Sequence, residues 1–348
     1  MNQPFVAGVL KAPGGSVPQI EARLDLVDHW GSIKVRWGIG RMEYLVDPGL
    51  YALGNPDKEA PVLVTANYKL SFDHLRGSLP DRHAWILVLD TKGVNVWCAA
   101  GKGTFGTEEL VNRIETSGLE KVVAHRKLIL PQLAAPGIAA HQVKKRSGFR
   151  VLYGPIRAKD LPNFLDAGNK ATPEMRRKNF SILERTVLIP IELVSAMKWL
   201  LIIAPILFLI GGMSGPAGFW VNAANHGLFA VLGLFCGVTA GTILTPLLLP
   251  WLPGRAFALK GLSMGLIMAG VLTAFRADLL GEWAGRIEVL GWWFLIPAVS
   301  AFLAMNFTGA STYTSLSGVR KEMKWAVPLE IIAGVVGLGL WLSSLFIL

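Results

Sequence analysis

Ala84-Trp85-Ile86-Leu87-Val88-Leu89-Asp90 is the stretch of sequence that decides the fold. Six apolar residues in a row, closed by an aspartate, are typical of a strand that is buried on both faces of a parallel sheet. After a break at 91–94 comes Asn95-Val96-Trp97-Cys98-Ala99-Ala100-Gly101-Lys102, where we expect about one helical turn over 96–100, ended by Gly101. The sequence therefore predicts Cys98 on a short helical turn at the carboxyl edge of a sheet.

More strands and helices are predicted on either side of this strand. The expected strands are 33–37, 61–66, 121–125, 128–130 and 150–153, and the expected helices are 71–78, 107–118 and 138–147. Strands that alternate with helices predict an α/β layer with a largely parallel sheet. In such sheets ligands bind at the carboxyl ends of the strands, which is where Cys98 is expected.

The composition of the 348-residue chain is too apolar for two soluble domains, since 52% of its residues are hydrophobic. Charged residues recur every few positions up to Lys178, whereas long uncharged stretches follow Thr186. We therefore expect an α/β domain at 1–168, a polar linker at 169–185 and an all-α membrane domain at 186–348. Five stretches of that domain are long enough to span a bilayer: 187–211, 222–250, 256–280, 286–308 and 325–348. The second span is expected to end early, because prolines 246, 250 and 253 fall near its end.

Basic residues outside the spans predict the orientation of the membrane domain. They gather before the first span, between the second and third, and before the fifth, so the positive-inside rule places the head and these loops in the cytoplasm. With five spans in the cytoplasmic (inner) membrane, the C-terminus is then expected outside. Residues 1–30 show no charged segment leading into an apolar one, so we expect no export of the head.

Several classes of function fit the sequence poorly. The net charge of +10 comes without a run of like charges or a basic stripe interleaved with aromatics, so we expect no nucleic-acid partner. Residues 101–106 match G-x-G-x-x-G, but they begin too far after Asp90 to form the tight turn of a dinucleotide site. A P-loop would need a glycine and a hydroxyl residue where the chain has Val96 and Gly103. A transport role is not favoured, because the ionisable residues within the spans lie nearer their ends than their middles: Glu192, Lys198, His226 and Glu330.

The residues alone leave three interpretations of Cys98 open. The chain has only two cysteines, Cys98 and Cys236, in different predicted domains, so a reduced structural thiol is the simplest interpretation. A catalytic nucleophile would need a base, and the sequence does not place His83 or His125. One thiolate beside Lys102, with flanking glycines, also fits an axial ligand to a metal that a macrocycle already holds. A structural zinc site would need more ligands than the chain offers.

Residues 95–102 resemble the cap-helix motif of the HgcA family, the membrane-anchored corrinoid proteins of microbial mercury methylation. Three further segments resemble the corrinoid domain of the large subunit of the corrinoid iron–sulfur protein: 64–73, 130–137 and 148–155. That similarity extends over residues 50–170, and the five predicted spans are a further likeness to the HgcA family. The resemblance implies a Rossmann-like head that binds a cobalamin-type corrinoid with its cobalt, followed by a transmembrane domain.

The resemblance also implies roles for individual residues. Cys98 would be the catalytic residue and the lower axial ligand of the cobalt, and its neighbours would build the cap under the ring: Asn95, Val96, Trp97, Ala99, Ala100, Gly101 and Lys102. Six residues at or just past predicted strand ends would contact the corrin or its nucleotide tail: Thr65, Asn67, Gln132, Gly137, Tyr153 and Gly154. A purely structural role stays open for these six, because such residues commonly punctuate loops.

The activity implied by the resemblance is a corrinoid-dependent methyl transfer to Hg(II), which gives methylmercury. Hg(II) is an electrophile, so the methyl group must leave with its electron pair, and an electron-donating thiolate from Cys98 would favour that departure. A methyltetrahydrofolate-linked donor would provide the methyl group, and a ferredoxin-like iron–sulfur protein of the HgcB type would provide electrons. Two alternatives remain: a corrinoid methyl carrier of one-carbon or acetyl-CoA metabolism, and a non-catalytic membrane corrinoid-binding protein.

The sequence departs from related corrinoid proteins in two respects. It has no cluster of cysteines, so we expect no iron–sulfur cluster in this chain. The Asp-x-His-x-x-Gly motif of methionine-synthase-like corrinoid proteins is also missing, because Ile86 stands where the glycine would follow Asp81 and His83. We therefore interpret His83 as an ordinary histidine of a loop or strand edge.

Overall fold

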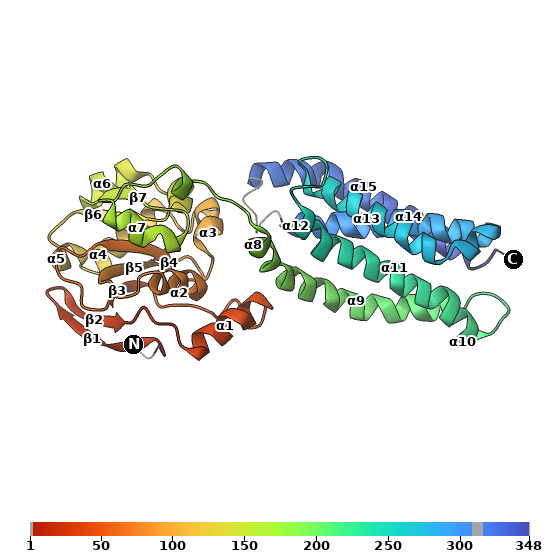
Figure 1. The fold of residues 1–348 in the computed structure, drawn as a ribbon, viewed down its shortest axis with the longest axis horizontal. Helices are drawn as coiled ribbons and strands as arrows, with labels where there is room; N and C mark the ends of the chain where they lie inside the picture. Colours follow the sequence, from red (N-terminus) through yellow and green to blue (C-terminus); the bar gives the residue numbers. More distant parts are fainter. Residues whose placement is uncertain (1–2, 308–315, 348) are drawn as a thin grey trace. The chain divides into compact units, whose positions relative to one another are not determined.

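The computed structural model describes residues 3–307 and 316–347, and the chain forms two compact units. The head unit ends at Asn179, and the helical unit begins at Phe180 and also includes Arg36–Gly38. Strands are found in the head unit, whereas the helical unit consists of helices and loops in its described part (Figure 1). This agrees with the predicted α/β head followed by an all-α domain.

A seven-stranded mixed sheet forms the centre of the head unit. Its strands, in spatial order, are β1 (Val6–Ala12), β2 (Gly15–Ile20), β3 (Gly49–Leu53), β5 (Ala84–Leu89), β4 (Val62–Ala66), β6 (Lys127–Leu130) and β7 (Arg150–Tyr153). The four strands from β5 to β7 are parallel, whereas β3 runs antiparallel to β5 and β1 runs antiparallel to β2. The carboxyl ends of β4, β5, β6 and β7 therefore lie at one edge of the sheet.

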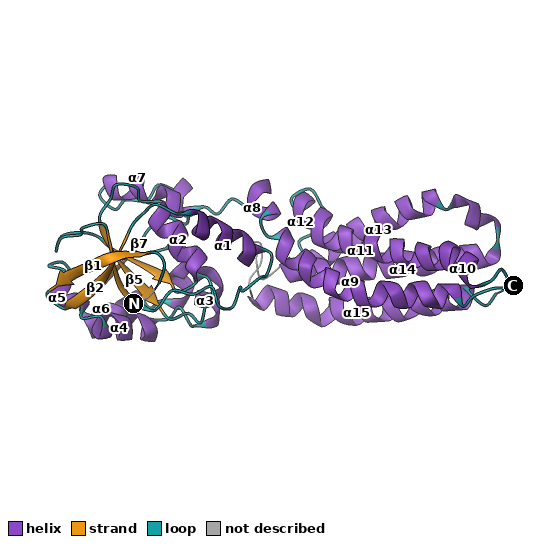
Figure 2. Ribbon diagram, turned by 90° about the horizontal axis from the view of Figure 1, so that it is seen from below, coloured by secondary structure: helices purple, strands orange, loops and turns teal. Residues whose placement is uncertain are grey.

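Strand β5 is buried on both faces, as its sequence predicts. Trp85, Leu87 and Leu89 pack into one apolar core, and the alternate residues 84, 86 and 88 pack into the other. Helices α4 (Thr107–Thr116) and α6 (Ala140–Ser147) cover the first face, and α2 (Lys69–Gly77) and α7 (Leu161–Asp166) cover the second, as Figure 2 shows. Because helices cover both faces, a polar ligand can reach the sheet only at its edges.

Four predicted strands are confirmed, namely 61–66, 84–90, 128–130 and 150–153, and two are wrong. The segment 33–37 lies at the end of helix α1 (Leu26–Arg36), and 121–125 begins in the short helix α5 (Leu119–Val122). The alternation Ile-Lys-Val-Arg-Trp imitates a half-buried strand, but in the helix Val35 is buried and Ile33 is exposed. Strands β1, β2 and β3 were not predicted, although the three expected helices match α2, α4 and α6.

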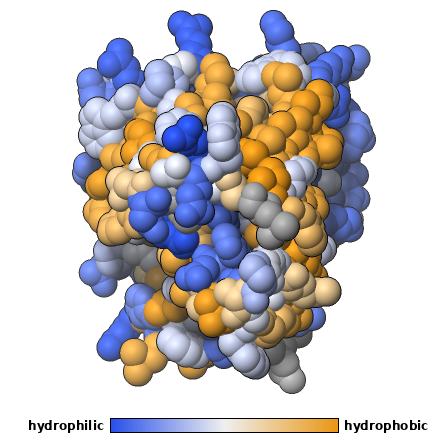
Figure 3. All heavy atoms as spheres, turned by 90° about the vertical axis from the view of Figure 1, so that its right-hand side faces the viewer, coloured by the Kyte–Doolittle hydropathy of each residue, from blue (hydrophilic) through white to orange (hydrophobic). Residues whose placement is uncertain are grey.

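The helical unit contains five stretches long and apolar enough to cross a membrane: Ile182–Gly212, Phe219–Leu248, Phe257–Phe275, Trp283–Asn306 and Gly318–Ser344. The five predicted spans are confirmed to this extent, and the second ends at Leu248, ahead of Pro250. The predicted span ends at 308 and 348 lie outside the described residues. Large hydrophobic side chains along these stretches are exposed, among them Leu201 and Val335. Figure 3, which views one end of the molecule, shows both hydrophobic and hydrophilic patches there. An apolar outer surface of this kind suits helices that face lipid.

The stretches are built from short helices and two π-helical turns as well as long helices. The elements are α8 (Ile182–Thr186), α9 (Ile189–Gly212), α10 (Phe219–Asn222), η4 (Ala223–Gly227), α11 (Leu228–Thr239), η5 (Ala240–Leu244), α12 (Thr245–Leu248), α13 (Phe257–Phe275), η6 (Ala277–Gly281), α14 (Trp283–Asn306) and α15 (Leu316–Ser344). Glycines let α14 approach both neighbours: a Cβ at Gly291 would lie 2.9 Å from the Gly337 oxygen of α15, and one at Gly261 of α13 would lie 2.6 Å from the Ser300 oxygen. Small residues at helix interfaces are the usual means of close packing in membranes.

Helix α1 is held to the head unit by a buried cluster of charges. Asp28 lies 2.5 Å from both Lys69 Nζ and Arg76 Nη2, and Asp73 lies 2.6 Å and 2.8 Å from the same two cations. Burial would raise the pKa of Asp28, but the hydrogen bond from Lys69 and the charges of Arg76 and Lys69 outweigh it and lower the pKa below its ordinary 3.8. Asp28 therefore stabilises the fold above that pH and loses its contribution as the pH falls through the lowered pKa.

Replacing Asp28 by Asn should lower the free energy of unfolding of the head by about 3 kcal/mol at neutral pH, because it leaves buried Arg76 short of a counter-charge. Hydrogen exchange of the β5 amides in the full chain, corrected for intrinsic rates, measures this loss. The difference between variant and wild type should shrink as the pH falls below 3.8. Asp166→Asn, in an exposed pair with Arg82, is the matched control and should change nothing measurable. Equal protection in Asp28→Asn and wild type at neutral pH would contradict the role of the cluster.

Candidate functional site

The connection from β5 to helix α3 (Val96–Lys102) carries Cys98. It begins at Asp90, whose backbone N–H donates to Glu109 Oε1 at 2.9 Å and whose carboxylate accepts from Lys92. Burial would raise the pKa of Asp90, but its hydrogen bonds from Lys92 lower it overall. The prediction that Gly101 ends the helical turn is wrong, because α3 continues to Lys102 and ends at Gly103, which has a φ of 83°. A left-handed C-cap suits a glycine, and Gly101 remains inside the helix.

Helix α3 begins with a side-chain cap that acts directly on the Cys98 residue. The Oδ1 atom of Asn95 accepts a hydrogen bond from the backbone N–H of Cys98 at 2.9 Å. Ala99 and Ala100 enter the apolar core of the α4 and α6 face, whereas the Cys98 side chain is half-buried and Gly101 and Lys102 are exposed. Because residues three and four apart share one side of a helix, Asn95, Cys98, Gly101 and Lys102 form its outer face. The thiol of Cys98 therefore lies on the outer face of α3, and one turn later this face carries Gly101, which has no side chain.

Asn67, at the end of β4, organises the loop that leads to α3. Its Oδ1 accepts hydrogen bonds from the N–H and Oγ1–H of Thr91 at 3.1 Å and 2.9 Å and from the N–H of Gly93 at 3.0 Å. The Oγ1 of Thr91 lies 2.7 Å from the Val94 carbonyl oxygen, and the Nδ2 of Asn67 donates to Asp90 at 3.4 Å. Asn67 is almost fully buried, so these groups have few alternative partners in water. One side chain thus joins the ends of β4 and β5 and fixes the start of the Cys98 helix.

The 3-10 turn η1 (Gln132–Gly137), which follows β6, packs against α3. A Cβ at Gly137 would clash with the carbonyl oxygen of Phe105 and lie 3.1 Å from the Cα of Ala100. Only glycine allows this approach of the two backbones. The carbonyl of Ile138, directly after η1, accepts a hydrogen bond from Tyr153 Oη at 3.2 Å, and burial raises the pKa of this phenol. The end of β7 is thereby tied to the turn beneath α3.

The structure brings the predicted site residues to one edge of the sheet. The cap residues 95–102 form α3 and its N-cap, Thr65 and Asn67 end β4, Gln132 and Gly137 bound η1, and Tyr153 and Gly154 end β7. Gln132 is engaged by the guanidinium of Arg176, from the 3-10 turn η3 (Glu174–Arg176). Asp90 and Thr91, which also lie at this edge, were not among the predicted site residues. Their place directly after β5 was the available signal, since the same rule selected Asn67 and Gly154.

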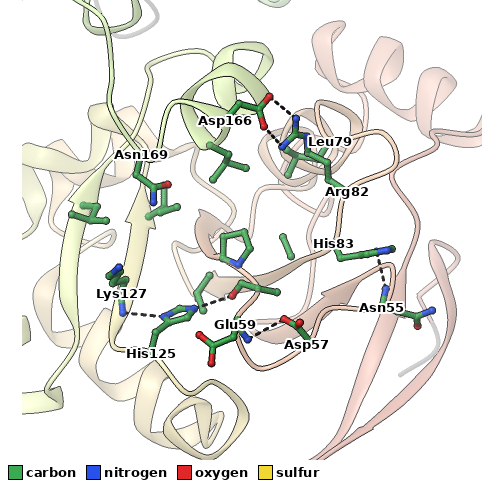
Figure 4. A pocket seen from close by; sticks show the side chains of 17 residues that line it. Asn55, Asp57, Glu59, Leu79, Arg82, His83, His125, Lys127, Asp166 and Asn169 are labelled. Carbon is green, nitrogen blue, oxygen red and sulfur yellow. Dashed lines mark hydrogen bonds and ion pairs between the residues drawn. The ribbon is translucent and has the colours of Figure 1, made fainter.

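His83 and His125 lie at the opposite edge of the sheet from Cys98. Both line a cavity of about 670 Å³ at the amino ends of β4, β5 and β6, together with Asp57, Glu59 and the Arg82–Asp166 pair, as Figure 4 shows. The Nδ1 of His83 accepts from the Asn55 N–H at 3.1 Å, and His125 bridges the Ala60 carbonyl and the Lys127 N–H. The six residues of β5 separate the two edges by about 20 Å, so neither histidine can serve Cys98 as a base. The interpretation of His83 as a strand-edge histidine is confirmed.

Comparison with known proteins finds a family model that matches the head unit and relatives that match about a third of the chain. Residues 40–165 match the family model described as CO dehydrogenase/acetyl-CoA synthase delta subunit. The acetyl-CoA decarbonylase/synthase complex subunit gamma of Methanothermobacter thermautotrophicus is 35% identical over 128 residues, which are 36% of this chain and 28% of the relative. The subunit of the same name from Methanopyrus kandleri is 37% identical over 123 residues, 35% of this chain and 26% of the relative. The matched part thus spans little more than a quarter of these relatives. The family model matches residues of the head unit.

Replacing Asn67 by Ala should loosen the β5–α3 connection, because two backbone N–H groups and the Thr91 hydroxyl lose their buried acceptor. We expect the free energy of local opening to fall by about 2 kcal/mol, and the amides of residues 91–98 to exchange roughly 30-fold faster. Hydrogen exchange of the full chain measures this. Asn112→Ala, on the exposed side of α4, is the control and should leave these amides unchanged. Slow exchange in both variants would contradict the organising role of Asn67.

Proposed function

We propose that the head unit binds a corrinoid against the outer face of α3 and carries a methyl group, with Cys98 as the lower axial ligand. The observation that carries this proposal is the half-buried thiol on a capped helix at the carboxyl edge of the parallel strands. Ligands of open α/β sheets bind at this edge. The names of the matched relatives place those proteins in acetyl-CoA-forming or acetyl-CoA-cleaving complexes, which supports a carrier of one-carbon units.

The residues present fit such a group. Among residues 3–307 and 316–347, no group of three or more His, Cys, Asp or Glu side chains could hold a metal ion unaided. A single thiolate is, however, the usual complement to a macrocycle that supplies the other metal ligands. Gly101 leaves room for a flat ring one turn after Cys98. When bound, the corrinoid would supply the cobalt-held methyl group, and the chain would supply the axial sulfur and its position.

Each predicted residue then has a defined task. Asn95 and Asn67 fix the position from which the thiol projects, and Gly137 lets η1 support α3 from the side of the core. Trp97 is half-buried and Lys102 is exposed on α3, and both would pack against the ring. Val96 packs against the apolar core beside Ala99 and Ala100 and would support the cap from that side. Gln132, Tyr153, Gly154 and Thr65 are proposed contacts to the corrin or its nucleotide tail. Preorganisation of this kind reduces the entropic cost of ligand binding.

The more specific proposal is that Hg(II) is the methyl acceptor. Two observations favour it: the cap carries a cysteine, and the chain has five stretches long and apolar enough to cross a membrane, which lie outside the residues that the family model matches. A thiolate donates electron density to the metal it ligates. Hg(II) accepts a methyl group only together with its electron pair, and an electron-rich axial ligand favours that transfer. A carrier in acetyl-CoA metabolism with a different acceptor is the alternative.

The proposal also includes partners and a location. A methyltetrahydrofolate-linked donor would load the methyl group, and a separate ferredoxin-like iron–sulfur protein would keep the cobalt reduced. We propose that the head lies in the cytoplasm, with the C-terminus outside, because basic residues flank the first, third and fifth stretches. The spans would at least anchor the head in the inner membrane.

The optical spectrum of the full chain with bound hydroxocobalamin tests the axial ligand. Wild type should show a thiolate-to-cobalt band, and Cys98→Ala should lose it. Cys236→Ala, which removes the cysteine of the helical unit, is the matched control and should keep the band. Retention of the band in Cys98→Ala would contradict the proposed ligand. Its loss in both variants would show that the thiol of the helical unit is required as well.

A single-turnover experiment with isotopically labelled methyl group tests the acceptor. The methyl-loaded full chain should transfer the label to Hg(II) faster than free methylcobalamin does. Cys98→Ala should lower this rate by about 100-fold, since even loss of a group in the outer coordination shell costs 10- to 100-fold. Transfer no faster than from free methylcobalamin, with the spectral band intact, would favour the acetyl-CoA carrier over mercury methylation.

A further inference from the structure

Helix α1 has its apolar side turned away from the protein. Asp28 faces the head unit through its ion pairs. Asp28 and Val35 are buried, whereas Leu26, Trp30 and Ile33 are 85%, 57% and 47% exposed. The exposed residues stand at positions i, i+4 and i+7, so they share one side of the helix. A helix on the surface of a soluble domain normally presents the opposite arrangement, with its apolar side toward the core.

The inversion is enforced by the buried charges that hold the helix. Asp28 forms ion pairs of 2.5 Å with Lys69 and Arg76 and cannot turn outward without leaving two buried cations short of a partner. The helix lies beside α2 (Figure 2). Its polar side is fixed toward the head unit, and the side that carries Leu26, Trp30 and Ile33 is exposed. The loop after the helix continues this surface with Ile39 and Met42, which are 62% and 72% exposed. We call Leu26, Val27, Trp30, Ile33, Ile39 and Met42 the α1 apolar surface.

Cations border the α1 apolar surface. The Nζ of Lys34 lies 5.8 Å from the centre of the Trp30 ring, and the guanidinium of Arg41 lies 5.9 Å from the ring of Tyr68. The acid in the middle of the helix, Asp28, is neutralised inside the head, so acidic side chains are confined to the flanks, at Asp25 and Glu43. Aliphatic and tryptophan side chains with lysine and arginine beside them are characteristic of helices that lie in the headgroup layer of a membrane.

A bilayer is within reach of this surface because of the chain itself. The head unit ends at Asn179, and the first stretch able to cross a membrane begins at Ile182. Three residues of extended chain reach about 10 Å. An apolar surface on a domain tethered so closely to a membrane span has lipid available at a high effective concentration. We propose that the α1 apolar surface docks the head unit onto the membrane surface by inserting into the headgroup layer of anionic lipid.

Photolabelling from the lipid phase tests the proposal. The full chain in nanodiscs of phosphatidylglycerol, with a diazirine on a fraction of the acyl chains, is illuminated and digested with trypsin. We expect the peptide 24–34 to be labelled several-fold above the peptide 103–113 of α4, which lies on the other face of the sheet. Labelling of 24–34 should be weaker in phosphatidylcholine discs, because the cations then lose their lipid counter-charges.

Variants separate lipid docking from other causes of labelling. Trp30→Ser with Ile33→Ser should reduce labelling of 24–34 at least fivefold, whereas Val9→Ser, at an equally exposed apolar residue of β1, should leave it unchanged. Lys34→Glu, in which the corresponding tryptic peptide is 24–36, keeps the apolar side chains and should abolish the preference for phosphatidylglycerol, so the test survives if the double variant does not fold. Labelled spans with an unlabelled peptide 24–34 would overturn the proposal and indicate that protein, such as a second copy, covers this surface. Unchanged labelling in the double variant would overturn it as well.

Discussion

The amide side chain of Asn67 is the interaction on which the arrangement of the candidate site depends. It lies between the carboxyl ends of β4 and β5 and accepts three hydrogen bonds from the loop that begins α3. Residues that a buried strand delivers to the sheet edge are only roughly placed, since the loop after a strand has many conformations. Here the polar groups of that loop find a buried acceptor on the neighbouring strand. The position of Cys98 is therefore set by the sheet rather than by the short helix that carries it.

A seven-residue helix has little stability of its own, because helices shorter than about 12 residues are marginal in water. Helix α3 persists because its N-terminus is capped by Asn95, its C-terminus ends in Gly103, and Ala99 and Ala100 are buried in the core. Small residues at these two positions let η1 approach through Gly137. The outer face, outside the core, carries Cys98, Gly101 and Lys102. This division explains why a motif rich in alanine and glycine can hold one side chain in a defined position.

The sequence predicted the parallel half of the sheet and the carboxyl-edge position of Cys98, because β4, β5 and β6 are continuous apolar runs. It did not predict β1, β2 and β3. Strand β1 is only half-buried along its length, and β2 contains a proline, so neither carries the signal of a buried strand. The segment 33–37 was misassigned for a different reason: tertiary charge pairs at Asp28 orient α1, and no local pattern contains that information. The hydrogen bonds of Asn67 were equally hidden, although its place at a strand end was correctly selected.

Two features of the head unit determine which parts of its surface are accessible to ligands. The faces of the sheet are covered by helices, and at the amino edge the Nδ1 of His83 and both ring nitrogens of His125 are bonded to the backbone. At the carboxyl edge, Cys98 has a half-buried thiol, and Gly101, one turn further along α3, has no side chain. The polar side of helix α1 forms the ion pairs with Lys69 and Arg76, and its apolar side is exposed. Hydrophobic burial alone would favour the opposite orientation of α1, with its apolar side toward the core. The buried charges that prevent the opposite orientation stabilise an exposed apolar surface. Such a surface is complementary to lipid, and the same chain carries five stretches long and apolar enough to cross a membrane.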